Sequence, residues 1–180
     1  MAYFSQRTGT SDLDGIWDDG DFTTWDEMNG YIHDQDLEEQ FPHADVEVVK
    51  VFSSIISSAK RYYDLTGRYL QIWGELGELY AEIQYGLKRH EPHTAGSDGS
   101  IDNNFIEVKT ISPQKGCEKV DLKTAGNFSR LIVVKISPDF TFKSRMIERS
   151  ELKINGKKKK VAWDTLSPEL EMSYSPEDIF

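Results

Sequence analysis

Three residues, Asp98, Glu107 and Lys109, have the side-chain types and the spacing needed to hold a divalent cation beside an ammonium group. Glu107 and Lys109 stand two positions apart in the apolar run Phe105–Ile111, and side chains on a strand alternate faces. Both therefore project from one face of a predicted strand. Asp98 precedes Glu107 by nine positions, in a glycine-rich turn that can fold back as a hairpin. Hard cations such as Mg²⁺ are held by one or two carboxylates plus water, which this convergence would supply.

A helix predicted over residues 69–87 must lie close to this strand if it is to add a further carboxylate. Its apolar stripe predicts the buried face: Ile72, Leu76, Leu79, Ile83 and Leu87. Glu75, Glu78 and Glu82 form a second stripe, because residues three, four and seven apart share a helix face. Taken alone, this stripe is typical of a solvated acidic edge. Beside the strand, Glu78 or Glu75 becomes a candidate third carboxylate.

The chemistry available to these groups is metal-dependent hydrolysis of a phosphodiester. Asp98 and Glu107 are the candidate metal ligands, with Glu78, and Lys109 can orient the attacking water or stabilise charge on the phosphate. The competing interpretation is an exposed strand face with an ordinary Glu–Lys pair, which contributes about 0–1 kcal/mol. Asp102 is an alternative to Asp98, although it precedes Asn103 and Asn104 and so has the residue types of a tight turn.

The order Asp98, then Glu107-Val108-Lys109, resembles the PD-(D/E)xK motif of the restriction-endonuclease-like nuclease superfamily. The resemblance extends from about residue 71 to 153. Similar proteins carry an acidic residue on the preceding helix, as Gly74–Glu78 does here, and Ser97 stands where the motif has proline. The resemblance implies a Mg²⁺-dependent DNA endonuclease, with Mn²⁺ as a substitute, that works as a homodimer. It implies catalytic roles for Asp98, Glu107, Lys109 and Glu78 or Glu75.

A second hypothesis of another class is a non-catalytic module on the same fold, which mimics nucleic acid or binds protein. Its basis is the acidic N-terminal segment. Catalysis requires that Asp98, Glu107, Lys109 and a helix glutamate lie around one cavity. Scattered positions would favour the binding module.

Charge is distributed unevenly along the 180 residues, whose formal net charge is −10. Residues 1–50 hold 13 acids and two bases, whereas residues 83–163 hold 9 acids and 16 bases. The half that carries the motif is therefore basic, as a protein that binds DNA requires. No apolar run approaches a membrane span of roughly 18 residues. The single cysteine, Cys117, excludes an intrachain disulfide and favours a cytoplasmic location.

The pattern as a whole predicts an α/β fold: a central mixed β-sheet of about four or five strands flanked by helices, of restriction-endonuclease-like type. The expected domains are an acidic N-terminal arm over 1–43, a nuclease domain over 44–166 and a C-terminal tail over 167–180. The expected elements, besides those above, are a helix over 44–63, a helical turn over 118–125, strands over 131–136 and 140–147, and a hairpin of 152–154 with 157–163 through an Asn155-Gly156 turn. Lys157–Lys160 suit either phosphate contacts or the protection of a sheet edge.

Overall fold

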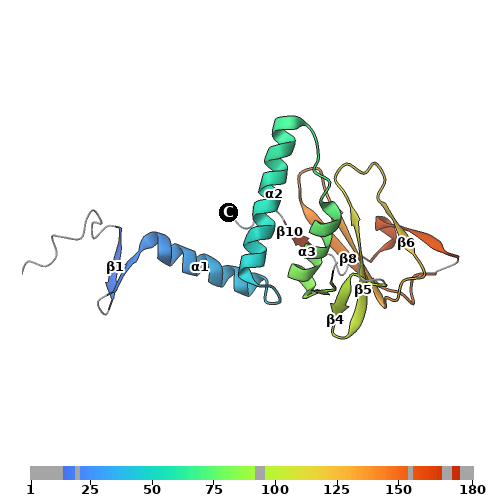
Figure 1. Ribbon diagram of the computed structural model, residues 1–180, viewed down its shortest axis with the longest axis horizontal. Coiled ribbons are helices and arrows are strands. Elements are labelled where there is room, and N and C mark those ends of the chain that lie inside the picture. Colours follow the sequence, from blue (N-terminus) through green and yellow to red (C-terminus); the bar gives the residue numbers. More distant parts are fainter. Residues whose placement is uncertain (1–13, 19–20, 92–95, 154–155, 168–171, 175–180) are drawn as a thin grey trace, which may run out of the picture. The chain divides into compact units, whose positions relative to one another are not determined.

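The computed structural model describes residues 14–18, 21–91, 96–153, 156–167 and 172–174. The chain divides into two compact units, residues 1–42 and 43–180, and Figure 1 labels many of their elements. None of the helices in these described ranges is both long and apolar enough to span a bilayer. The expected tail lies largely outside the described ranges, as does Asn155 of the predicted turn.

The first unit contains a hairpin, β1 (Gly15–Asp18) with β2 (Asp21–Thr24), followed by α1 (Trp25–Gln40). Thr24 caps α1 through a reciprocal pair of hydrogen bonds. The backbone N–H of Glu27 donates to the Thr24 hydroxyl at 3.2 Å, and the Thr24 N–H donates to the Glu27 carboxylate at 2.9 Å. The segment predicted as an arm thus contains two strands and a helix. Its role as an arm stays a prediction.

Two helices of the second unit precede its sheet, as predicted. α2 (Val46–Thr66) begins where the Asp45 carboxylate accepts the Glu47 N–H at 2.8 Å, and it ends at Gly67, which has a left-handed φ of 64°. α3 (Trp73–Tyr85) is shorter than the predicted helix over 69–87. Its buried face also differs: Tyr80 and Ala81 are buried where the apolar stripe predicted Leu79, which is only half-buried.

The sheet of the second unit has six strands in the order β10-β8-β7-β5-β4-β3. β5 and β7 pair in parallel, and every other neighbouring pair is antiparallel, so the sheet is mixed as predicted. Two short edge strands, of two and three residues, bring the number above the expected four or five. The strands are β3 (Lys88–Arg89), β4 (Gly99–Ile101), β5 (Asn104–Ile111), β7 (Arg130–Ile136), β8 (Phe142–Glu148) and β10 (Met172–Tyr174).

One face of the sheet packs against α2 and α3, both drawn on the same side of it in Figure 1. Phe142 on β8 contacts Phe52 of α2 and Tyr80 of α3, with ring centroids 5.2 and 5.4 Å apart. Gly77 of α3 lies so close to β5 that a Cβ atom there would overlap the Thr110 hydroxyl. This close approach positions the acidic residues of α3 beside the strand that carries Glu107 and Lys109.

The opposite face packs against a two-stranded ribbon, β6 (Lys119–Lys123) with β9 (Lys158–Ala162), and the short 3-10 helix η1 (Trp163–Thr165). Two predictions are wrong here. Residues 119–123 form a strand rather than a helical turn, and β9 pairs with β6 rather than with 152–154. The physical reason is burial, because alternate residues of β6 and β9 complete a core that includes Leu131 and Val133 of β7.

Candidate active site

Asp98 lies immediately before β4, at the open end of the hairpin that β4 forms with β5. Its backbone N–H donates to the Ile106 carbonyl at 2.9 Å, and its carboxylate accepts the Val108 N–H at 2.6 Å. The predicted hairpin is therefore present, with its turn at Asp102 and Asn103 rather than in the glycine-rich stretch around Asp98. A backbone donor fixes one Asp98 carboxylate oxygen against the strand that carries Glu107 and Lys109.

Lys109 joins the two carboxylates. Its Nζ lies 2.6 Å from Oε1 of Glu107 and 3.9 Å from Oδ2 of Asp98, and it also donates to the Val108 carbonyl at 3.0 Å. The three side chains are mostly enclosed, with exposed fractions of 14% for Glu107, 25% for Asp98 and 30% for Lys109. Charges held in such surroundings interact more strongly than a solvated surface pair does.

Glu78 is linked electrostatically to the same group. Burial raises the pKa of its carboxyl to about 7, and the negative charges of Asp98 and Glu75 add to that rise. Arg89 and Lys109 lower the Glu78 pKa, and the burial and carboxylate effects exceed theirs. The raised pKa of Glu78 therefore reflects mainly its burial, to which the neighbouring carboxylates add.

Glu75 and Glu82 have a different partner. Nε of Arg89 lies 2.7 Å from Glu82, and NH1 of Arg89 lies 3.9 Å from Glu75. The Glu75 side chain is 82% exposed, and no described hydrogen bond or ion pair joins it to Asp98, Glu107 or Lys109. Of the two helix acids that the sequence left open, Glu78 is therefore the one with an electrostatic link to the group around Lys109.

Asp102 lies at the tip of the same hairpin. It is exposed, and both Asp102 and Asn103 have left-handed φ values, 47° and 63°, as a tight turn between antiparallel strands requires. The Asn104 side-chain amide donates to the Asp102 carbonyl at 3.3 Å. Asp102 thus serves the turn, and Asp98 is the aspartate that approaches Lys109.

A cleft of about 350 Å³ opens between the first turn of α3 and β5. Of the four residues expected around one cavity, Glu78 and Lys109 line this cleft. Asp98 and Glu107 are not among its lining residues, and they are connected to it through their contacts with Lys109. Trp73 contributes an indole N–H that is buried without a hydrogen-bond partner in the described structure. The other lining residues are mostly polar: Gln71, Gly74, Val108, Thr110, Ser112 and Gln114.

The sequence did not identify most of these lining residues. Gln71 and Gln114 lie 43 positions apart and meet through a 3.3 Å side-chain hydrogen bond, a contact that no local pattern predicts. Ser112 could have been predicted as a lining residue, because it directly follows β5 and so lies at the end of the strand that carries Glu107 and Lys109.

The carboxylates suit a hard cation held partly by water. No three His, Cys, Asp or Glu side chains in the described ranges gather closely enough to enclose a metal ion by themselves. Mg²⁺ is usually held by one or two carboxylates with several waters retained. Asp98 and Glu107, which share the Lys109 ammonium, fit that donor set, and the raised Glu78 pKa indicates that added positive charge is favourable nearby.

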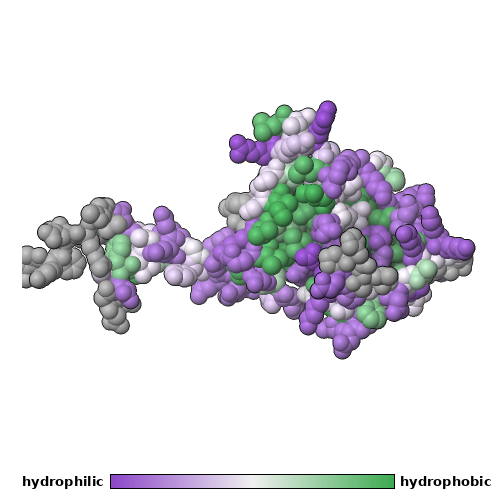
Figure 2. Space-filling model, in the orientation of Figure 1, coloured by the Kyte–Doolittle hydropathy of each residue, from purple (hydrophilic) through white to green (hydrophobic). Residues whose placement is uncertain are grey.

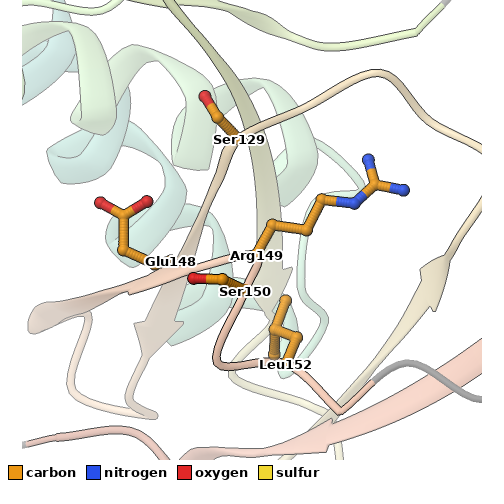
Figure 3. A pocket seen from close by; sticks show the side chains of 5 residues that line it. All are labelled: Ser129, Glu148, Arg149, Ser150 and Leu152. Carbon is orange, nitrogen blue, oxygen red and sulfur yellow. The ribbon is translucent and has the colours of Figure 1, made fainter.

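A second hollow, of about 600 Å³, lies at the end of β8 and is lined by Ser129, Glu148, Arg149, Ser150 and Leu152 (Figure 3). The Arg149 guanidinium is engaged in holding the chain before β7. It donates to the carbonyls of Thr124 at 2.8 Å, Phe128 at 3.1 Å and Gly126, and it lies 4.4 Å from the centre of the Phe128 ring. We therefore assign Arg149 a structural role.

Comparison of the sequence with models of known protein families gave no match, and comparison with curated proteins also gave none. The chemistry of this site is accordingly inferred from its own residues.

Proposed function

We propose that the protein is a Mg²⁺-dependent endonuclease that hydrolyses phosphodiester bonds in DNA. The observation that carries this proposal is the Lys109 ammonium, which lies 2.6 Å from Glu107 and 3.9 Å from Asp98 and borders the same cleft as Glu78. The PD-(D/E)xK resemblance implies the same activity, and the succession α3, β4, β5, β7 is consistent with a restriction-endonuclease-like fold.

Each residue of the group has a distinct role in this proposal. Asp98 and Glu107 hold the cation, Mg²⁺ or Mn²⁺, and Glu78 adds charge from the helix. When bound, the cation supplies Lewis-acid stabilisation of the negative charge that develops on the phosphate. Lys109 is already directed at both carboxylates by its contacts, so it is placed to orient the attacking water and to stabilise the phosphate oxygens.

The non-catalytic alternative rests on acidic surface. α1 carries an exposed group of acids, Asp36, Glu38 and Glu39, which suits imitation of nucleic acid. The shared cleft of Glu78 and Lys109 favours catalysis, because mimicry of DNA needs acids on an open surface and has no use for a semi-enclosed lysine. Many nucleases that the motif resembles cut both DNA strands as dimers, and by that analogy we include a homodimer in this proposal.

The test is incubation of supercoiled plasmid with the protein in Mg²⁺ or Mn²⁺, with and without chelator. We expect nicked or linear product only with metal, and none from Glu107→Gln. The matched control is Asp64→Asn, which removes an exposed carboxylate of α2 and should cleave like the wild type. Cleavage that persists with chelator, or that is equal in both variants, would show that the assignment is wrong.

A further inference from the structure

The β6–β9 ribbon presents a lysine-rich outer surface. Directly opposed residues of an antiparallel pair project from the same face. The register opposes Lys119 to Ala162, Asp121 to Lys160 and Lys123 to Lys158. This outer face therefore carries four lysines and one aspartate, and all five of these charged residues are exposed.

The inner face of the ribbon determines which residues point outward. Val120, Leu122 and Val161 are each at most 3% exposed and belong to the core that contains Leu131, Val133 and Trp163. A shift of register by one residue would bring lysines into this core and expose the aliphatic side chains. The direction of the lysine face is thus fixed by the burial of its opposite face.

The ribbon lysines differ in their partners from four other basic residues of the unit. Lys109, Arg89, Arg130 and Lys135 each form an ion pair with a glutamate. Within the described ranges, Lys119, Lys123, Lys158 and Lys160 have no carboxylate within ion-pair distance. Moreover, Lys123 and Lys158 stand directly opposite each other, an arrangement of like charges that destabilises a strand pair.

A groove of about 320 Å³ beside β9 extends this basic surface. Lys153 and Lys159 line it together with Lys119 and Lys160, and Glu151 is the acid among its lining residues. The Lys159 ammonium donates to the Lys153 carbonyl at 2.7 Å, which holds that side chain against the groove wall. Figure 2 shows hydrophilic residues over the part of the second unit where Figure 1 labels β6.

We propose that the outer face of the ribbon binds the phosphate backbone of duplex DNA. This inference rests on the proposed function, and it adds a binding surface outside the cleft. Lysines without protein partners can neutralise phosphates and release counterions, which provides affinity without sequence preference. A two-stranded ribbon also has the dimensions of the major groove of a duplex. Protection of a sheet edge, the competing role, does not explain why lysines cover the outward face and oppose one another.

The test compares two variants with equal loss of charge. The first is Lys123→Gln/Lys158→Gln/Lys160→Gln on the ribbon, and the second is Lys60→Gln/Arg61→Gln/Arg68→Gln, which removes three exposed bases in and just after α2. Binding of a labelled duplex is followed by fluorescence anisotropy, with chelator present so that no cleavage occurs, over a series of salt concentrations.

We expect the ribbon variant to bind about tenfold or more weakly at low salt, and its slope of log affinity against log salt to fall by about 2–3. The control should change little. Equal losses in both variants, an unchanged slope in a folded ribbon variant, or tighter binding of RNA than of duplex DNA would each overturn the proposal. If the triple variant fails to fold, Lys158→Gln alone should lower the slope by about 1.

Binding and cleavage fail independently in this design. If wild-type protein binds DNA through the ribbon and does not cleave it, the endonuclease proposal is wrong and the binding surface remains. If wild-type protein cleaves, and neutralisation of the ribbon changes neither binding nor cleavage, the binding surface is wrong and the active site remains. A ribbon variant that aggregates while its soluble fraction binds normally would assign the lysines to protection of the sheet edge.

Discussion

The carboxylate group around Lys109 and the lysine face of the ribbon hold charge in opposite ways. In the first, acids are partly enclosed and paired, and Glu78 has a pKa raised to about 7 by burial and by like charge. In the second, four exposed lysines have no described carboxylate partner. Enclosed charge suits a small ligand that must be held in fixed geometry, whereas open charge suits a long polyanion that binds through many weak contacts.

The largest effect should come from the lysine that belongs to the enclosed group. We expect Lys109→Ala to lower the single-turnover rate of plasmid cleavage by about 10²–10³, because it removes a charge that stabilises the transition state. Affinity for DNA in chelator should change far less. Lys60→Ala, an exposed lysine of α2, is the control. If Lys109→Ala and Lys60→Ala cleave equally fast, Lys109 has no catalytic role, and the contrast between the two regions is wrong for the first of them.

A substitution that adds side-chain volume and alters no charge should affect the cleft and leave the ribbon intact. Gly77→Ala forces a Cβ atom into the Thr110 hydroxyl, so we expect a loss of about 1–3 kcal/mol in the free energy of unfolding. Gly74→Ala, three residues earlier in an open position, should gain up to about 1 kcal/mol from helix propensity. Urea denaturation measures both. Thr110→Ala combined with Gly77→Ala should restore part of the loss, and strict additivity of the two changes would argue against this contact.

The raised Glu78 pKa predicts a pH dependence of stability. Between about pH 4.5 and 7 the folded protein binds more protons at Glu78 than the unfolded chain does, so this contribution is present at low pH and is lost as pH rises. Because the side chain is half-exposed, we expect the stability of wild type relative to Glu78→Gln to fall by only about 1 kcal/mol from pH 5 to 8. Urea denaturation of both proteins at both pH values measures it. A difference that grows with pH would contradict the assignment.

The smallest effect concerns the acids of the first unit. Asp36→Asn/Glu38→Gln/Glu39→Gln on α1 removes three negative charges, so the net charge rises by three units, whereas it falls by three in the ribbon variant. We expect affinity for duplex DNA to rise about two- to threefold at low salt and to be unchanged near physiological salt, where exposed charges are screened beyond about 8 Å. Fluorescence anisotropy gives both values. A larger rise that persists in salt would indicate a direct role of α1 in excluding DNA.

Local signals account for what the sequence predicted correctly. Asp45 and Gly67 mark the ends of α2, the unbroken apolar run of β7 predicts an internal strand, and the turn residues Asp102 and Asn103 predict the β4–β5 hairpin that places Asp98. The start of α1 was not predicted, although Thr24 and Glu27 have the spacing of a capping box.

Prediction from the sequence failed where two strands pair across a long stretch of chain. Residues 118–125 are predicted as a helical turn where Lys119–Lys123 form a strand, and the Asn155-Gly156 turn predicts a local hairpin that the pairing of β9 with β6 replaces. The partner of β6 is β9, and only the completed core shows why Val120, Leu122 and Val161 face inward together. The electrostatic link of Glu78 to Asp98 and Lys109 likewise depends on how closely α3 approaches β5 at Gly77, which periodicity does not reveal.

The distant pairing of β6 with β9 sets an order of events during folding. A hairpin such as β4–β5 closes a short loop and forms within about 1–10 μs, whereas β6 must wait until residues 158–162 are present and collapsed onto the same core. We expect the Asp98–Glu107 hairpin to form early and the ribbon late. A chain still emerging from the ribosome would then possess the carboxylates of the cleft before it possesses the lysine face, and the surface that we propose for DNA would form only after residues 158–162 are made.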